Sequence, residues 1–163
     1  IAWVQDGRPM AGVIYLPVTH TLYFGMEGMG AFKVGDVTVA KSEEELIRAA
    51  QRLPIEKQHE GFVVVASRSH LSGETEAYID LLRKDHPDLS LISAGSSMKL
   101  CRVAEGSADV YPRFAPTMEW DTAAGDAIVR AAGGEVVDTE RHLPLVYNKA
   151  DLRNPDFIVT CKS

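Results

Sequence analysis

Cysteine is scarce in this sequence, and long apolar runs and internal repeats are missing from it. The two cysteines, Cys101 and Cys161, show no metal-ligand spacing, which excludes a cysteine-held metal site. No apolar run approaches the length needed to cross a membrane, so we expect no integral membrane segment. Free thiols favour a reducing compartment and hence a cytoplasmic location. A disulfide between the two cysteines remains the alternative.

Positive charge is also in deficit. The 163 residues include 17 Lys and Arg against 23 Asp and Glu, giving a formal net charge of −6. This balance argues against sequence-independent binding to nucleic acid, which depends on many cationic contacts to phosphates. An acidic protein that binds a polyanionic substrate must concentrate its cations locally or use metal ions. The 45% hydrophobic and 25% charged residues are typical of one globular domain with a real core.

The start of the sequence is unusual. It begins Ile1-Ala2-Trp3-Val4, without a methionine, a signal peptide or a helix cap, and this run is typical of the middle of a strand. We therefore expect the sequence to be part of a longer chain.

Three segments follow one another along the chain. Residues 1–40 predict an antiparallel β-meander, with strands at 1–4, 11–16, 21–25, 31–33 and 37–39 and an Asp6-Gly7 hairpin turn. In residues 41–60, a capping box from Ser42 to Glu45 predicts a short helix that ends before Pro54, and residues 51–60 predict an exposed connection.

Residues 61–163 predict an α/β domain that binds phosphate. Strands are expected at 62–66, 89–94, 108–114, 135–137 and 157–160, and helices at 73–84, 96–105 and 121–132. The fold class is therefore α/β: an antiparallel meander followed by a mixed sheet with helices. Small residues after Asp121 should let the last helix pack closely on its neighbours.

Three loops that follow strands carry residues able to bind anions or metals. They span 67–70, 95–99 and 112–121, and in an open α/β sheet such loops share one rim. His70 can donate to a phosphate oxygen. Ser96 and Lys99 open a helix, where free N–H groups favour phosphate. Arg113 offers a fork for bidentate phosphate binding, and the Asp121 carboxylate suits a hard metal ion.

Each of these residues also has an ordinary structural interpretation. His70 could be satisfied by backbone groups, Lys99 could be a solvated lysine behind an N-capping serine, and Arg113 could form a surface ion pair. Asp121 could be only an N-cap for its helix. From the residues alone, the structural interpretation is favoured for the 95–99 loop. Among the remaining acids, Glu119 and Asp109 are expected to be structural and Asp126 to be solvated.

Residues 112–125, with Trp120-Asp121 at their centre, resemble the C-terminal motif of the inositol-monophosphatase superfamily of metal-dependent phosphatases. The Ser67-Arg68-Ser69-His70 string is similar to one in its 3'(2'),5'-bisphosphate nucleotidase branch, and the resemblance extends from Gly12 to Ile158. It implies a layered sugar-phosphatase-like fold. It further implies that Asp121 binds Mg²⁺ and also the substrate, which His70, Ser96, Lys99 and Arg113 bind as well.

The resemblance also implies a function. Arg113 stands where related inositol phosphatases have an acid, which indicates a substrate with a second phosphate. The expected reaction is Mg²⁺-dependent hydrolysis of adenosine 3',5'-bisphosphate, a small phosphorylated nucleotide, to AMP and phosphate, in support of sulfate assimilation. A homodimer is left open. The alternatives are an inositol monophosphatase or fructose-1,6-bisphosphatase-like enzyme, and a non-catalytic nucleotide-binding module.

The family's other metal-binding motifs are not found in this sequence. The resemblance places a helix glutamate, an acidic pair and a D-P-L/I-D-G-T motif upstream of the region that matches. A single aspartate cannot hold Mg²⁺ tightly, because Mg²⁺ keeps most of its waters unless several anionic ligands cooperate. We therefore assign no catalytic residue within these 163 residues and expect the chain by itself to be inactive.

Overall fold

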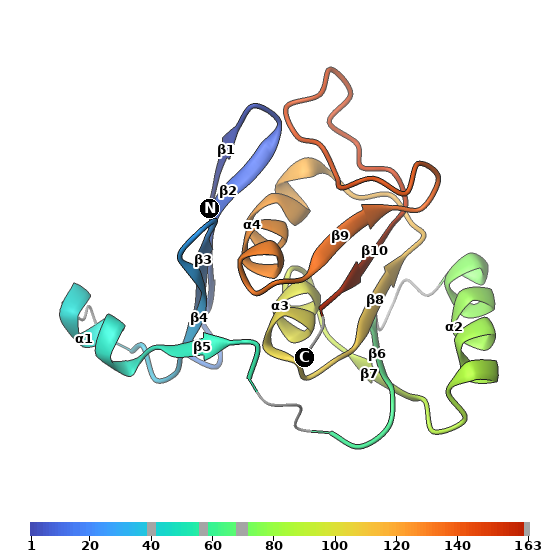
Figure 1. The fold of residues 1–163 in the computed structure, drawn as a ribbon, viewed down its shortest axis with the longest axis horizontal. Helices are drawn as coiled ribbons and strands as arrows, with labels where there is room; N and C mark the ends of the chain where they lie inside the picture. The colour runs from blue at the N-terminus through green and yellow to red at the C-terminus, as the bar shows by residue number, and fades with distance from the viewer. Residues whose placement is uncertain (39–41, 56–58, 68–71, 162–163) are drawn as a thin grey trace.

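A computed structural model of the chain describes residues 1–38, 42–55, 59–67 and 72–161. The described residues form two five-stranded sheets and four helices (Figure 1). The first sheet is antiparallel, and its strands lie in the order β1 (Ala2–Gln5), β2 (Arg8–Leu16), β3 (Thr21–Met26), β4 (Gly30–Val34) and β5 (Gln51–Leu53).

The second sheet is mixed, with the strand order β7 (Ser90–Ser93), β6 (Val63–Ala66), β8 (Val110–Arg113), β10 (Phe157–Thr160) and β9 (Glu135–Asp138). Strand β6 runs parallel to both β7 and β8, whereas β10 is antiparallel to β8 and β9. The carboxyl ends of β6, β7 and β8 therefore lie at the same edge of the sheet.

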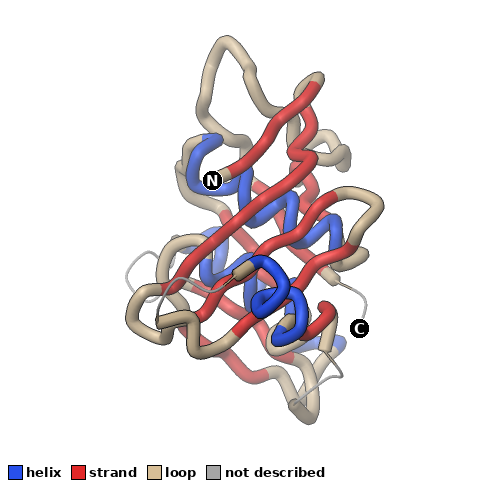
Figure 2. Tube along the Cα trace, turned by 90° about the vertical axis from the view of Figure 1, so that its left-hand side faces the viewer, coloured by secondary structure: helices blue, strands red, loops and turns tan. Residues whose placement is uncertain are grey.

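The helices form two layers. Helices α3 (Met98–Glu105) and α4 (Glu119–Ala131) lie between the sheets, and α2 (Gly73–Asp85) lies on the outer side of the second sheet (Figure 1). Figure 2 looks at the first sheet from the side opposite α3 and α4, with the short helix α1 (Glu43–Ala49) in front of it. The expectation of a layered α/β fold with a meander and a mixed sheet is thus confirmed.

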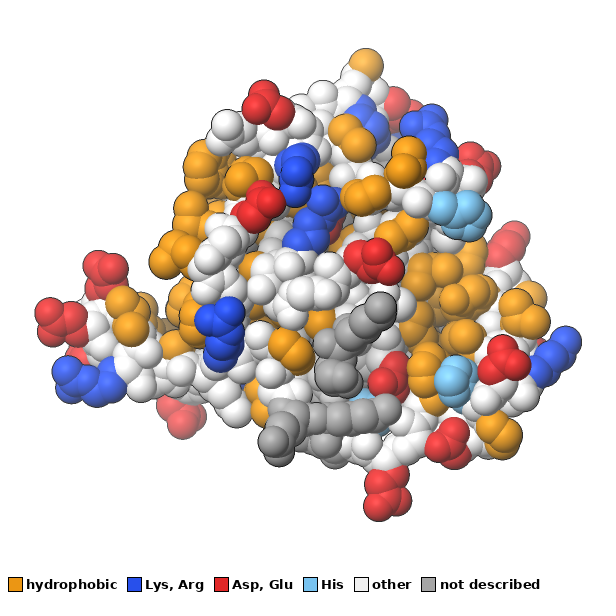
Figure 3. Space-filling model, in the orientation of Figure 1, with side chains coloured by type: hydrophobic (Ala, Val, Ile, Leu, Met, Phe, Trp, Pro, Cys, Tyr) orange, Lys and Arg blue, Asp and Glu red, His pale blue; other side chains and the backbone are white. Residues whose placement is uncertain are grey.

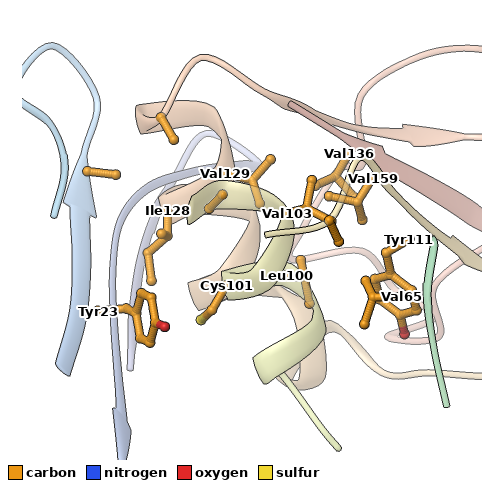
Figure 4. Packing of buried hydrophobic residues seen from close by; sticks show 14 of the residues in the cluster. Tyr23, Val65, Leu100, Cys101, Val103, Tyr111, Ile128, Val129, Val136 and Val159 are labelled. Carbon is orange, nitrogen blue, oxygen red and sulfur yellow. The ribbon is translucent and has the colours of Figure 1, made fainter. Parts of the chain in front are cut away.

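The two central helices hold the sheets together by close packing. In Figure 4, Cys101 of α3 points toward Tyr23 of the first sheet, whereas Val103 of α3 points toward valines of the second. A Cβ atom at Gly12 of β2 would lie 2.1 Å from the Ala124 carbonyl oxygen of α4. One at Gly125 would lie 2.8 Å from Leu100 Cβ of α3. The small residues of α4 therefore permit the close approach that the sequence predicted.

Local signals located the helices well. Ser42 and Glu45 form the reciprocal capping box at the start of α1, and Ser72 accepts a hydrogen bond from the Thr75 N–H at the start of α2. Among the strands, the prediction for residues 157–160 matches β10. Both cysteines are free thiols, with Cys101 buried in the core.

Four predictions need correction. Val37 and Thr38 belong to no strand, and Val39 lies outside the described residues. Instead β5 completes the first sheet within the expected exposed connection, because Leu53 pairs opposite Ala31 and is buried. Helix α4 begins at Glu119, with Met118 at its N-cap position, and so Asp121 is its third residue. Asp126 is not solvated but completely buried.

Candidate metal and phosphate site

The three loops singled out in the sequence follow β6, β7 and β8, whose carboxyl ends share one edge of the second sheet. A cavity of about 220 Å³ opens at this edge, and it is lined by Ser96, Lys99, Arg113 and Asp121, together with Tyr111 and Thr117. The structure therefore brings together four of the five side chains that were expected to bind substrate or metal. The fifth, His70, lies outside the described residues.

Lys99 is buried rather than solvated. The residue is 4% exposed, and its Nζ donates to the carbonyl oxygens of Ser96 at 3.0 Å and Ala94 at 3.3 Å. Nζ also lies 5.3 Å from the centre of the Tyr111 ring, within range of a cation–π interaction. Burial, and then the charge of Arg113, lower the pKa of Lys99 to about 8. An anion in the cavity would oppose both effects and favour the protonated lysine.

Arg113 ends β8 and turns its guanidinium onto the following loop. Its Nε donates to the Ala115 carbonyl at 3.2 Å, and one terminal nitrogen donates to the Pro116 carbonyl at 3.3 Å. Within the described ranges no carboxylate lies at salt-bridge distance from Arg113 or Lys99. The surface ion pair considered for Arg113 is therefore not seen there, and the two cations lie beside the same cavity.

Ser96 adopts a backbone conformation that is uncommon for serine. Its φ of 47° lies in the left-handed region, so its exposed side chain stands at a sharp turn just before α3. It is not the N-cap of that helix: Ser97 holds that position and makes no side-chain capping bond. Ser97 Oγ instead donates to the Asp121 backbone carbonyl at 3.2 Å, which ties the 95–99 loop to the start of α4.

Asp121 is the acid of the cavity. Its Oδ2 accepts a hydrogen bond from the Met118 N–H at 2.9 Å, the geometry of a third helical residue that reaches back to the cap. Asp121 is thus not an N-cap, as the structural interpretation supposed. Among the described residues no donor engages its Oδ1, so one oxygen of an exposed carboxylate remains for a cation.

The donor set fits a hard cation such as Mg²⁺ only in part. A carboxylate oxygen is the ligand type that Mg²⁺ prefers, yet Mg²⁺ held by protein usually needs further anionic ligands. The part of the chain that the structure describes contains no group of three His, Cys, Asp or Glu side chains that could hold a metal. Asp121 can therefore serve as one ligand of a site completed by other groups.

Two buried acids act as structural anchors near the site. As expected, Glu119 is structural: its carboxylate accepts hydrogen bonds from the Asn148 and Lys149 N–H groups and pairs with the Lys149 ammonium. Asp126, expected in solvent, instead pairs with Arg130 at 2.6 Å and accepts from the Tyr147 hydroxyl at 2.8 Å. Burial raises the pKa of Asp126 despite these partners. Tyr147, Asn148 and Lys149 lie between β9 and β10, in a segment whose sequence has no periodic pattern to show which acids they contact.

The two five-stranded sheets, the two helices packed between them and the cavity at the strand ends define a layered α/β fold of the sugar-phosphatase type. A family model described as "Inositol monophosphatase family" matches residues 1–160, and the chain belongs to this family.

Individual relatives narrow the comparison. The crystal structure of CysQ from Bacteroides thetaiotaomicron superposes with a TM-score of 0.93 at 54% identity, covering 99% of this chain and 61% of that one. The 3'(2'),5'-bisphosphate nucleotidase CysQ of Salmonella typhimurium is 37% identical over 160 residues, 98% of this chain and 58% of the relative. Staphylococcal IMPase-II, at 20% identity and a TM-score of 0.69, shares the fold. The chain thus spans about three fifths of the length of these relatives.

No helix in the described part of the chain has the length and apolar character required to cross a membrane. On the face shown in Figure 3, Lys and Arg side chains are interspersed with Asp and Glu and form no continuous basic surface. This face therefore gives no support to binding of nucleic acid through its backbone.

Proposed function

We propose that a protein that contains this chain and has the full length of the relatives is a Mg²⁺-dependent 3'(2'),5'-bisphosphate nucleotidase. This protein is called the full-length enzyme below. Its reaction is hydrolysis of adenosine 3',5'-bisphosphate to AMP and phosphate. The observation that carries the proposal is the convergence of Lys99, Arg113 and Asp121 on one cavity of about 220 Å³. The similarity to the Salmonella CysQ supplies the substrate class.

Each residue has a role that its surroundings support. Lys99, buried and without a carboxylate partner in the described residues, neutralises a phosphate oxygen and stays protonated while the anion is bound. Arg113 holds a second phosphate through the donors that the loop carbonyls leave free. Ser96, at its left-handed turn, offers a hydroxyl to the same anion. Asp121 contributes one carboxylate oxygen to a metal site, and the bound Mg²⁺ supplies charge neutralisation and an activated water.

The remaining parts of the proposal rest on the resemblance. His70 binds the substrate from the 67–70 loop, and Asp121 helps to orient the substrate that its metal binds. The enzyme acts in the cytoplasm in sulfate assimilation, and it recognises a small phosphorylated nucleotide.

The decisive experiment measures phosphate release by the full-length enzyme. With Mg²⁺ we expect kcat/KM for adenosine 3',5'-bisphosphate to exceed that for inositol 1-phosphate and for fructose 1,6-bisphosphate by at least about tenfold. A preference for either sugar phosphate would instead establish the neighbouring phosphatase specificity. Loss of activity on addition of a chelator, and its recovery with Mg²⁺, tests the metal requirement separately.

A second candidate, a non-catalytic nucleotide-binding module, applies to the 163-residue chain by itself. It is favoured by the finding that no metal-binding group of three occurs among the described residues. This chain alone is expected to release no phosphate at any Mg²⁺ concentration while retaining weak binding of adenosine 3',5'-bisphosphate. Calorimetric titration with the nucleotide, with and without Mg²⁺, measures both properties. Robust turnover by the isolated chain would contradict the expectation.

A further inference from the structure

The segment that joins β9 to β10 returns to the start of α4 just before β10 begins. There the Glu119 N–H donates to the Leu152 carbonyl at 2.9 Å, and the Asn154 N–H donates to the Thr117 carbonyl at 2.9 Å. Met118 and Arg153 form an isolated antiparallel bridge between these two bonds. The backbone that delivers Asp121 to the cavity is therefore paired with residues more than thirty positions later in the chain.

The Asn154 side chain extends this pairing into the first turn of α4. The residue is 6% exposed, and its Nδ2 lies 2.9 Å from the Met118 carbonyl, 3.0 Å from Thr122 Oγ1 and 3.1 Å from Thr117 Oγ1. Because a carbonyl oxygen can only accept, the amide nitrogen must face Met118. The Oδ1 atom is buried and has no partner among the described residues. The Asn154 side chain therefore acts as a hydrogen-bond donor to these neighbours, and its acceptor oxygen takes no part in the contacts.

Met118 connects Asn154 to the metal-binding acid. Its carbonyl accepts from Asn154 Nδ2, while its N–H donates to Asp121 Oδ2 at 2.9 Å. The backbone of Met118 thus takes part in both hydrogen bonds. A shift of this backbone would therefore rotate the Asp121 carboxylate. A second contact comes from another loop, because Ser97 Oγ donates to the Asp121 backbone carbonyl at 3.2 Å.

We propose that Asn154 is a positioning residue for Asp121: through Met118 it fixes the carboxylate in the orientation that binds the metal. The proposal rests on the proposed function, since it assumes that Asp121 is a metal ligand. It extends that function because it makes metal affinity depend on the buried Asn154 side chain, which does not line the cavity. Partners that orient a metal ligand change metal affinity about 10- to 100-fold when they are removed.

The test compares metal binding by variants of the full-length enzyme without substrate. Asn154→Asp keeps the size and shape of the side chain but replaces the NH2 group, with its two N–H donors, by a second carboxylate oxygen. Asn148→Asp makes the same chemical change at an exposed position of the same segment and serves as the matched control. Mn²⁺, which takes the same oxygen ligands as Mg²⁺, is titrated and followed by electron paramagnetic resonance.

We expect Asn154→Asp to weaken Mn²⁺ binding by about tenfold or more and Asn148→Asp by less than threefold. Asn154→Ala, neutral and without donors, should weaken binding as Asn154→Asp does; it carries the test if the aspartate variant does not fold, and near-UV circular dichroism checks folding. Unchanged Mn²⁺ affinity in a folded Asn154 variant would overturn the proposal.

An Asp121→Ala variant distinguishes this failure from failure of the proposed function. If Asp121→Ala loses Mn²⁺ affinity and the folded Asn154 variants do not, only the positioning role is wrong. If Asp121→Ala itself binds Mn²⁺ normally, the metal assignment of the proposed function is wrong and the inference falls with it. A raised Mg²⁺ requirement in Asn154→Asp, with unchanged KM for the nucleotide at saturating Mg²⁺, would support positioning over a general structural effect.

Discussion

Replacing Asp121 by asparagine separates the two tasks that the structure gives this residue. Its carboxylate accepts the Met118 N–H within the first turn of α4 and leaves one oxygen toward the cavity. Asparagine keeps an oxygen that can accept the Met118 N–H but removes the negative charge. The helix bond should therefore survive, whereas binding of a hard cation should not.

The two effects differ widely in size. A negative charge in the first turn of a helix is worth about 0.3–1 kcal/mol at an exposed position. In a protein of this size that corresponds to a fall in Tm of about 1–4 °C. By contrast, a unit charge ~2 Å from a divalent cation is worth ~4 kcal/mol even at the dielectric constant of water. Affinity for the metal should then fall on the order of a thousandfold.

The assay uses the full-length enzyme and two measurements. Differential scanning calorimetry without metal gives Tm, and Mn²⁺ titration followed by electron paramagnetic resonance gives the metal affinity. Asp85→Asn, the same chemical change at the last residue of α2, is the control for net charge. If Asp121→Asn melts far below the wild type yet keeps its affinity for Mn²⁺ within threefold, the residue is only a structural part of the helix start, and the reasoning is refuted.

Three further outcomes follow from the site and its supports. In the full-length enzyme, Arg113→Glu should lower kcat/KM for adenosine 3',5'-bisphosphate by an amount equivalent to at least about 2 kcal/mol, and far less for inositol 1-phosphate. The reason is that a charge-assisted contact is lost from the bisphosphate alone. Equal losses for both substrates in steady-state assays would make Arg113 a structural residue. The pKa of Lys99 is lowered from near 10.5 to about 8, so the unfolded chain binds more protons between these pH values. The unfolding free energy of the wild type relative to Lys99→Met, from urea denaturation, should accordingly rise from pH 8 to pH 10.5 and stay level below pH 8, and a flat difference would contradict the burial argument. Asp126→Asn should lower the unfolding free energy by about 3 kcal/mol, since it leaves the Arg130 guanidinium without its buried partner; a change below ~1 kcal/mol in urea denaturation would show that this pair is not needed.

Signals that act within a few residues were sufficient for much of the fold. The capping serines Ser42 and Ser72 fixed two helix starts because each bonds an N–H three residues away. The apolar run at 62–66 and the strand at 157–160 followed from composition alone. The rim of the site could also be predicted, because parallel strands place the loops that follow them at one edge. Lys99, Arg113 and Asp121 could therefore be placed at one edge of the sheet from the sequence.

What depends on partners far along the chain was settled only by the tertiary structure. Residues 51–53 become β5 because β4 offers them a free edge, and three residues are too few to show a strand pattern. Asp126 is buried because Tyr147 and Arg130 enclose it, and the segment that holds Tyr147 has no periodicity to reveal it. The same segment brings Asn154 beneath Met118. The sequence by itself determined which side chains lie at the carboxyl edge of the second sheet. Contacts between residues far apart in the chain determined their burial, their protonation and their orientation.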